Sequence, residues 1–279
     1  MSGTGYAVML GATRVLGYGG FVLSAGILSF LGLVWPQGRR HRQLVLLVWS
    51  GVVILALGTV LTPLVEASAS DVTLRDVATG TDGAAALVRL AVLAAVATYL
   101  PDLVSRDLHR WRLAAILLAV LAIDASLVAQ SDASDAAWPV VIVVAAMGHL
   151  IAVALWFGGL VAVAAVLLRD DRRHELQGIL PSFVRIAPAC AAALVVTGVP
   201  HALAVAGGIE RLAGTTYGAA LLAKVLLVGG MLLLADRTRR YLIGLPAGPH
   251  TLTRAVGAEL ALAAGVLVAT AFQVWFAPH

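Results

Sequence analysis

Two histidines lie inside apolar segments of this sequence, where a hydrocarbon environment offers an imidazole no water. His149 is part of the run MGHLIAVALWFGGL, residues 147–160, and His201 directly follows Pro200. A neutral imidazole can bind a transition-metal ion through one ring nitrogen. An intramembrane histidine can also act simply as a hydrogen-bond donor to a neighbouring helix. The two histidines are therefore candidate metal ligands, with helix packing as the alternative role.

Other side chains near the histidines could complete a metal site or line the path to it. Met147 carries a thioether but lies two residues from His149, which places it on another face of a helix. Trp156 lies seven residues after His149 on the same face, so this pair could form one wall of a cavity. Thr197, one turn before His201, would share the same path.

Charged side chains also occur within the apolar runs, and most of them fall at a similar depth. A rise of about 1.5 Å per residue places Asp124 about 9 Å and Lys224 about 12 Å from the outer helix ends. Arg14 and Arg89 lie in the same outer half, whereas Glu259 lies nearer the inner side. A charge at the bilayer centre costs about 3 kcal/mol on insertion scales and often marks function.

We expect a buried, mutually compensated charge network among these residues, because paired burial is how a membrane tolerates charge. Its expected members are Arg14, Arg89, Asp124, Glu66 and Glu259.

Lys224 has several possible roles. It could extend outward past Tyr217, which lies seven residues before it on the same helix face. It could instead pair with Asp124 or Glu259, or act as a gate or a ligand through a deprotonated amine.

Composition sets the class of protein. The 279 residues are 61% hydrophobic and 12% charged, whereas a soluble domain is about half apolar and about a quarter charged. These values predict an integral membrane protein of the all-α class. The net charge of +4 fits basic cytoplasmic loops and does not indicate nucleic-acid binding. The single cysteine, Cys190, excludes an internal disulfide and a multi-cysteine metal site.

Apolar runs predict a helical bundle of eight transmembrane spans joined by short loops. The spans are expected at residues 8–35, 43–65, 84–101, 113–130, 138–168, 182–207, 216–236 and 254–276. We expect the first span to be retained, because no basic segment precedes it. The chain then divides into two four-helix halves, 1–136 and 137–279. GAAALVRLAVL from Gly83 resembles GAALLAKVLLV from Gly218, which is compatible with a parallel four-plus-four repeat.

Four segments of the C-terminal half carry a recognisable pattern. They are HLIAVALWFGGL, FVRIAPACAAALVVTGVPHAL, TTYGAALLAKVLLVGGMLLLADRTRR and RAVGAELALAAGVLVA. Over about residues 145–275, this pattern resembles the copper resistance protein D (CopD) family. The shared features are H-x6-W-x-G-G, T-G, T-x-Y-G-x4-L-x-K and a glutamate in the last span.

The resemblance implies a function and a location. Members of the CopD family are bacterial inner-membrane proteins of copper uptake or homeostasis, often found beside a periplasmic CopC-type copper-binding partner. We therefore expect a copper transporter and not an enzyme, with His149, His201 and Met147 as candidate ligands. The same histidine and lysine pattern also resembles the HemJ-type protoporphyrinogen oxidases. In that alternative, His149 and His201 would be axial ligands of haem b in a membrane redox protein.

Basic residues occur in every second loop, which predicts the orientation in the membrane. The loops after spans 1, 3, 5 and 7 are basic and contain Arg39, Arg40, Arg42, Arg106, Arg110, Arg112, Arg169, Arg172, Arg173, Arg237, Arg239 and Arg240. The alternate loops are mainly acidic and contain Glu66, Asp71, Asp76, Asp82, Asp132, Asp135 and Glu210. Both termini are therefore expected on the extracytoplasmic side.

The orientation can be tested with reporter fusions. A fusion at residue 40 is expected to report the cytoplasm and a fusion at residue 135 the opposite side, because residue 40 lies in a basic loop and residue 135 in an acidic one. The compartment of each junction is measured by the activity of fused alkaline phosphatase and by the fluorescence of a fused fluorescent protein. Identical compartments for the two junctions would contradict the predicted topology.

Overall fold

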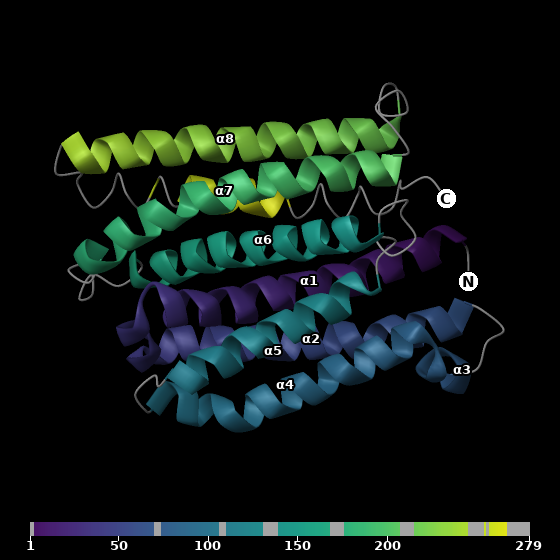
Figure 1. Cartoon of the computed structure of the whole chain (residues 1–279). Helices are drawn as coiled ribbons and strands as arrows, with labels where there is room; N and C mark the ends of the chain where they lie inside the picture. The colour runs from purple at the N-terminus through teal and green to yellow at the C-terminus, as the bar shows by residue number, and fades with distance from the viewer. Residues whose placement is uncertain are drawn as a thin grey trace.

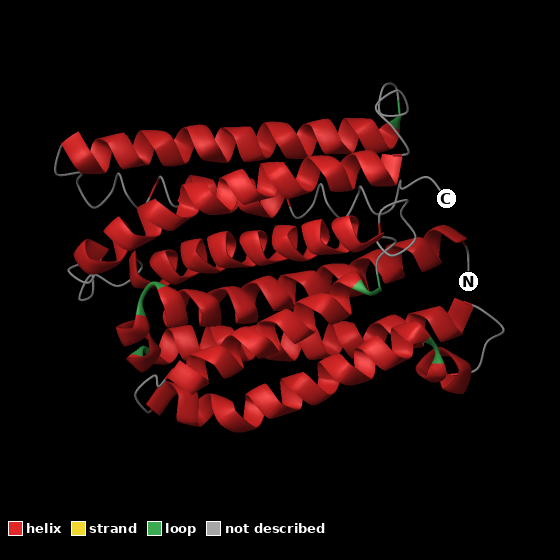
Figure 2. Ribbon diagram, viewed as in Figure 1, coloured by secondary structure: helices red, strands yellow, loops and turns green. Residues whose placement is uncertain are grey.

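The computed structural model describes residues 3–69, 74–105, 110–130, 139–167, 176–206, 215–244, 254 and 257–266. Every regular element within these residues is helical (Figure 2). The helices are α1 (Gly3–Leu33), η1 (Pro36–Arg40), α2 (Arg42–Ala69), α3 (Leu74–Thr79), α4 (Thr81–Ser105), α5 (Arg110–Val128), α6 (Pro139–Leu167), α7 (Leu176–Ala206) and α8 (Thr216–Gly244). A further apolar helix, Gly257–Val266, is called the C-terminal helix below.

The predicted all-helical, multi-span architecture is confirmed in its main features. Six helices, α1, α2, α4, α5, α6 and α7, are long and apolar enough to cross a membrane. The other two predicted spans correspond to α8 and the C-terminal helix, whose apolar stretches are shorter. The short α3 lies in a segment expected to be a loop. Asp76 in its first turn stabilises this helix, because a negative charge interacts favourably with the helix dipole at the N-terminus. The predicted division between residues 136 and 137 lies outside the described residues.

The helices form a row of neighbours across the bundle. In Figure 1 the row runs α8, α7, α6, α1, α2 and α4, and each adjacent pair is in contact. α5 packs against α4, α1 and α6. The beginning of α1 and the short α3 lie at the same end of the bundle (Figure 1), which we call the α3 end. The opposite end, where η1 lies, is called the η1 end.

α1 approaches α2 along glycines in both helices. A Cβ atom at Gly51 of α2 would lie 2.5 Å from the backbone nitrogen of Ser24, and one at Gly58 would lie 2.6 Å from that of Gly17. No side chain larger than hydrogen fits at these positions. The two backbones therefore touch, which lets dispersion forces hold helices together in lipid, where apolar burial gives no driving force.

α1 approaches α6 in the same way on another face. A Cβ atom at Gly26 would collide with the backbone carbonyl of Ala154, and one at Gly158 would lie 2.6 Å from the Cα atom of Gly26. One turn along α1, the rings of Phe30 and Phe183 pack edge to face with centroids 5.9 Å apart. The core of the bundle is thus centred on α1 and includes its contacts with α6 and α7.

Two adjacent glycines of α1 allow a controlled test of this packing. A Cβ atom at Gly20 would meet the backbone of Leu55, whereas one at Gly19 would have nothing within 4 Å. Gly20→Val is therefore expected to lower stability by about 1–3 kcal/mol or more through overpacking. Gly19→Val changes helix propensity equally and is the control. Thermal unfolding in detergent measures both, and equal midpoints would contradict the backbone contact of α1 with α2.

Candidate functional site

His149 of α6 is oriented by a threonine of α7. Its Nδ1 lies 3.2 Å from Thr197 Oγ1, and the Thr197 hydroxyl donates to the carbonyl of Ala193 at 2.5 Å. A hydroxyl has one proton, so the Thr197 oxygen must accept its second hydrogen bond from Nδ1–H. In the neutral imidazole this tautomer leaves the lone pair on Nε2. The sequence predicted a path shared by Thr197 and His201 and did not predict the contact of Thr197 with His149.

The backbone of α7 packs directly against the His149 ring. A Cβ atom at Gly198 would lie 3.1 Å from Cε1 of His149, and one at Gly148 would lie 3.5 Å from Cγ2 of Thr197. His149 is half-buried. α6 and α7 are therefore in van der Waals contact at the level of the imidazole.

His201 lies one turn beyond Thr197 on α7, so its Cα atom is on the face that meets α6. The turn moves it about 6 Å toward the α3 end. The side chain of His201 lies outside the described part of the structure, as does that of Tyr217.

The other two α6 candidates lie away from this contact. Met147 packs on Val128 and Ile142, toward α5, because it is about 200° around the helix from His149. Trp156 is 2% exposed in the apolar core, and its indole N–H has no hydrogen-bond partner among the described residues. The structure thus separates Met147 from His149 and places Trp156 in close packing.

A complete metal site is not formed by the described side chains alone. Among them, no three histidine, cysteine, aspartate or glutamate residues lie close enough together to hold one metal ion. Cys190 is buried in the core. At the contact between α6 and α7, the described side chains therefore supply one imidazole, that of His149, and His201 is the second candidate ligand from the sequence.

Arg89 of α4 is held by neutral groups. It is 3% exposed. Its Nε donates to Ser126 Oγ at 3.0 Å, and its Nη2 donates to the Ser126 carbonyl at 2.7 Å and to Gln130 Oε1 at 2.6 Å. Its Nη1 lies 3.4 Å from Thr59 Oγ1. Groups of α2 and of the end of α5 therefore fix the guanidinium of α4, and sequence reasoning missed all three partner residues.

Asp124 lies two residues before Ser126 on α5 but is not bonded to Arg89. It is 0% exposed, and neither carboxyl oxygen has a hydrogen-bond partner among the described residues. Two residues correspond to about 200° on a helix, so Ser126 faces α4 while Asp124 faces away from it. The expected charge network therefore does not join Asp124 to Arg89 by a hydrogen bond in this structure.

The remaining expected network residues of the N-terminal half surround one polar cavity at the α3 end. The cavity has a volume of about 40 Å³, enough for two or three water molecules. Its charged lining residues are Arg14, Glu66, Asp82 and Arg89, with Gln130 beside them. Gln130 also donates to the carbonyl of Asp82 at 3.0 Å. Two arginines and two acids thus meet around a space that water can occupy.

Lys224 and Glu259 lie at different levels of the C-terminal half. Gly230 is opposite Leu262, and Gly265 is opposite Leu227, which defines an antiparallel register between α8 and the C-terminal helix. In this register Glu259 lies about nine residues, or about 13 Å, from the level of Lys224. A direct pair between them would need a shift of more than two helical turns.

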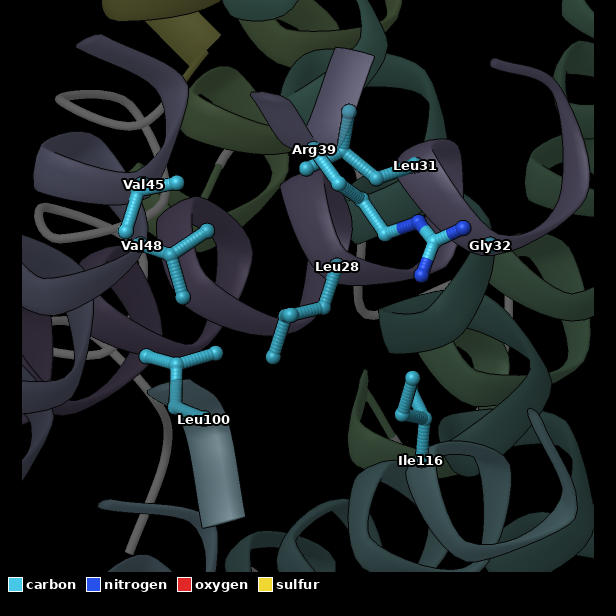
Figure 3. Close-up of a pocket in the computed structure, with 8 residues that line it drawn as sticks. All are labelled: Leu28, Leu31, Gly32, Arg39, Val45, Val48, Leu100 and Ile116. Carbon is cyan, nitrogen blue, oxygen red and sulfur yellow. The ribbon is translucent and has the colours of Figure 1, made fainter. Parts of the chain in front are cut away.

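The η1 end has a different character. A small pocket there is lined by Arg39 and by seven apolar or glycine residues, among them Leu28, Gly32 and Leu100 (Figure 3). Its volume is about 10 Å³, so it can hold one water molecule at most. Among these two cavities of the described N-terminal helices, the polar one thus lies at the α3 end.

The long apolar helices and the buried polar side chains define a multi-span helical membrane protein with ionisable groups inside the bundle. Residues 177–273 match the family described as copper resistance protein D, and this match supports a membrane protein of the CopD family. No curated protein and no solved structure matches the chain. The matched residues contain Thr197, His201, Tyr217, Lys224 and Glu259. His149, Met147 and Trp156 precede them, although the sequence resemblance was traced from about residue 145.

The arginine site predicts a difference between two serines. Ser126 and Ser50 each donate to a carbonyl of their own helix, but only Ser126 accepts from a buried guanidinium. Ser126→Ala is expected to lower the free energy of unfolding by about 1.5–3 kcal/mol, the value of a hydrogen bond to a charged group. Ser50→Ala is expected to change it little. Equal thermal midpoints for the two variants in detergent would contradict the described Arg89 geometry.

Proposed function

We propose that the chain transports copper from the extracytoplasmic side of a bacterial inner membrane toward the cytoplasm. The match of α7 and the following helices to the CopD family supports a copper-related role. The observation that carries the site assignment is the hydrogen bond between His149 Nδ1 and Thr197. Ligating histidines are commonly held in this way through the ring nitrogen that does not bind the metal.

In this proposal copper is the cargo and the α3 end faces outward. Acidic residues at that end, such as Glu66 and Asp82, attract cations. The ion then binds Nε2 of His149 and the imidazole of His201, and it leaves inward after α6 and α7 rearrange. A periplasmic CopC-type protein is the proposed donor. The proposal includes no chemical conversion, so the protein is not assigned as an enzyme.

The packing at His149 favours copper over haem b. A bis-histidine haem between α6 and α7 needs a gap for the macrocycle between the two helices. At His149, however, the α7 backbone at Gly198 is in van der Waals contact with the imidazole. A single copper ion needs far less space than a porphyrin.

Copper binding by purified variants tests this proposal. His149→Ala is expected to abolish stoichiometric copper binding and cellular copper accumulation. His41→Ala is the matched control, because His41 follows η1 and stacks on Trp35 outside the α6–α7 contact. Elemental analysis gives the stoichiometry. A Soret band in the parent that His149→Ala removes would support haem b instead, and unchanged copper binding in His149→Ala would contradict the site assignment.

Substitution of Thr197 tests how the imidazole is oriented. Thr197→Val removes the acceptor for Nδ1–H and is expected to weaken copper affinity about 10–100-fold, the usual effect of losing such a partner. Thr197→Ser keeps a hydroxyl that can bond both His149 and Ala193, and should retain affinity. Competition titration with a copper chelator measures the three affinities. Equal affinities for Val and Ser at position 197 would show that the hydrogen bond does not orient a ligand.

A further inference from the structure

Asp124 carries a buried carboxyl group on α5 that has no part in the proposed copper site. Its side chain is 0% exposed, and both oxygens lack a hydrogen-bond partner among the described residues. A carboxylate in such surroundings would lose its hydration without compensation, which costs several kcal/mol. A protonated carboxyl group avoids most of that cost. Ionisable residues inside membrane helices commonly belong to proton relays or transport pathways.

The helices packed on α5 offer Asp124 no ion pair in this structure. On α4, Arg89 is bonded to Ser126 and Gln130, and Asp82 lies near the helix start. On α1, Arg14 and Tyr18 line the polar cavity. On α6, His149 is bonded to Thr197 of α7. None of these groups donates a hydrogen bond to the Asp124 carboxyl.

The polar cavity brings water close to this carboxyl group. Leu127, three residues after Asp124, lines the cavity together with Gly17 of α1. A Cβ atom at Gly17 would lie 4.0 Å from the Leu127 side chain, so these two residues form one contact between α1 and α5. Three residues of helix correspond to about 4.5 Å along the axis. Asp124 thus lies less than one helical turn beyond a water-sized space that opens toward the α3 end.

We propose that Asp124 is a proton-binding site and that copper crosses the membrane together with a proton. This inference rests on the proposed copper transport. A proton from water at the α3 end passes through the cavity and neutralises the Asp124 carboxylate. When the bundle rearranges to release copper inward, the carboxyl group gives the same proton to water on the η1 side. Because the cavity lies at the end where copper enters, both ions load from the same side, which defines co-transport.

The full chain reconstituted in phospholipid vesicles tests this step. A pH-sensitive dye is enclosed in the vesicles, and copper is added outside. The parent is expected to take up copper and acidify the lumen. Asp124→Asn keeps the shape of the neutral acid but cannot carry a proton, so copper binding should persist while lumen acidification is lost. Asp124→Glu, which retains a titratable group, should restore acidification at least in part.

Asp76→Asn is the matched control, because Asp76 is an exposed carboxyl group on α3 at the same end of the bundle. Its acidification should equal that of the parent. Parent vesicles that take up no copper would overturn the proposed transport and this inference together. Copper uptake without acidification, or with an alkaline lumen, would overturn proton co-transport and leave copper transport intact. Acidification by Asp124→Asn equal to that of the parent would remove Asp124 from the proton path.

Discussion

The simultaneous backbone contact of α1 with α2 and α6 is the constraint on which the bundle depends. In lipid, helices gain nothing by hiding apolar side chains from one another, so they associate where small residues permit close approach. Glycines provide such positions on two faces of α1, at Gly20 for α2 and at Gly26 for α6. In the most apolar segment of α1, 61% of the residues are buried, whereas the corresponding share is 39% or less in the other five long helices. The functional groups on α4–α7 are therefore positioned relative to a common central helix.

Around this helix, the polar groups form two kinds of environment. Arg89 is almost saturated by fixed neutral acceptors, which suits a charge that stays in place. Asp124 has no hydrogen-bond partner among the described residues, and His149 is bonded to Thr197 through Nδ1. In the proposed transport mechanism, the fixed charge of Arg89 would maintain the geometry of the bundle while Asp124 and His149 exchange a proton and a copper ion.

The sequence was sufficient for the class of fold and for most helix positions, because runs of apolar residues long enough to cross a bilayer have few alternatives. It did not predict α3, whose six residues are too few for a periodic pattern. It identified Arg89 as buried and named acidic partners for it, whereas the hydrogen bonds that the structure describes go to neutral groups. Ser126, Thr59 and Gln130 are unremarkable residues individually, and only the register between helices brings them to one guanidinium.

The contact between His149 and Thr197 could not be predicted from the sequence either. Thr197 and His149 could be selected by type and depth, but their contact depends on how α6 and α7 rotate about their own axes. Met147 demonstrates this point, because its proximity to His149 along the chain is lost on the helix surface, where it turns toward Val128 and Ile142. The depth of a residue in the membrane can be estimated from its position in the sequence. Which faces of two helices meet depends on how the helices pack.

The central position of α1 also has a consequence for biosynthesis. α1 acquires one partner, α2, almost as soon as both are synthesised, but its second partner, α6, begins more than a hundred residues after the end of α1, at Pro139. During this interval the glycine face of α1 around Gly26 must remain available, covered only by exchangeable lipid. α6 therefore associates laterally with a preformed pair of α1 and α2, and any early dimerisation through the Gly26 face would compete with this step.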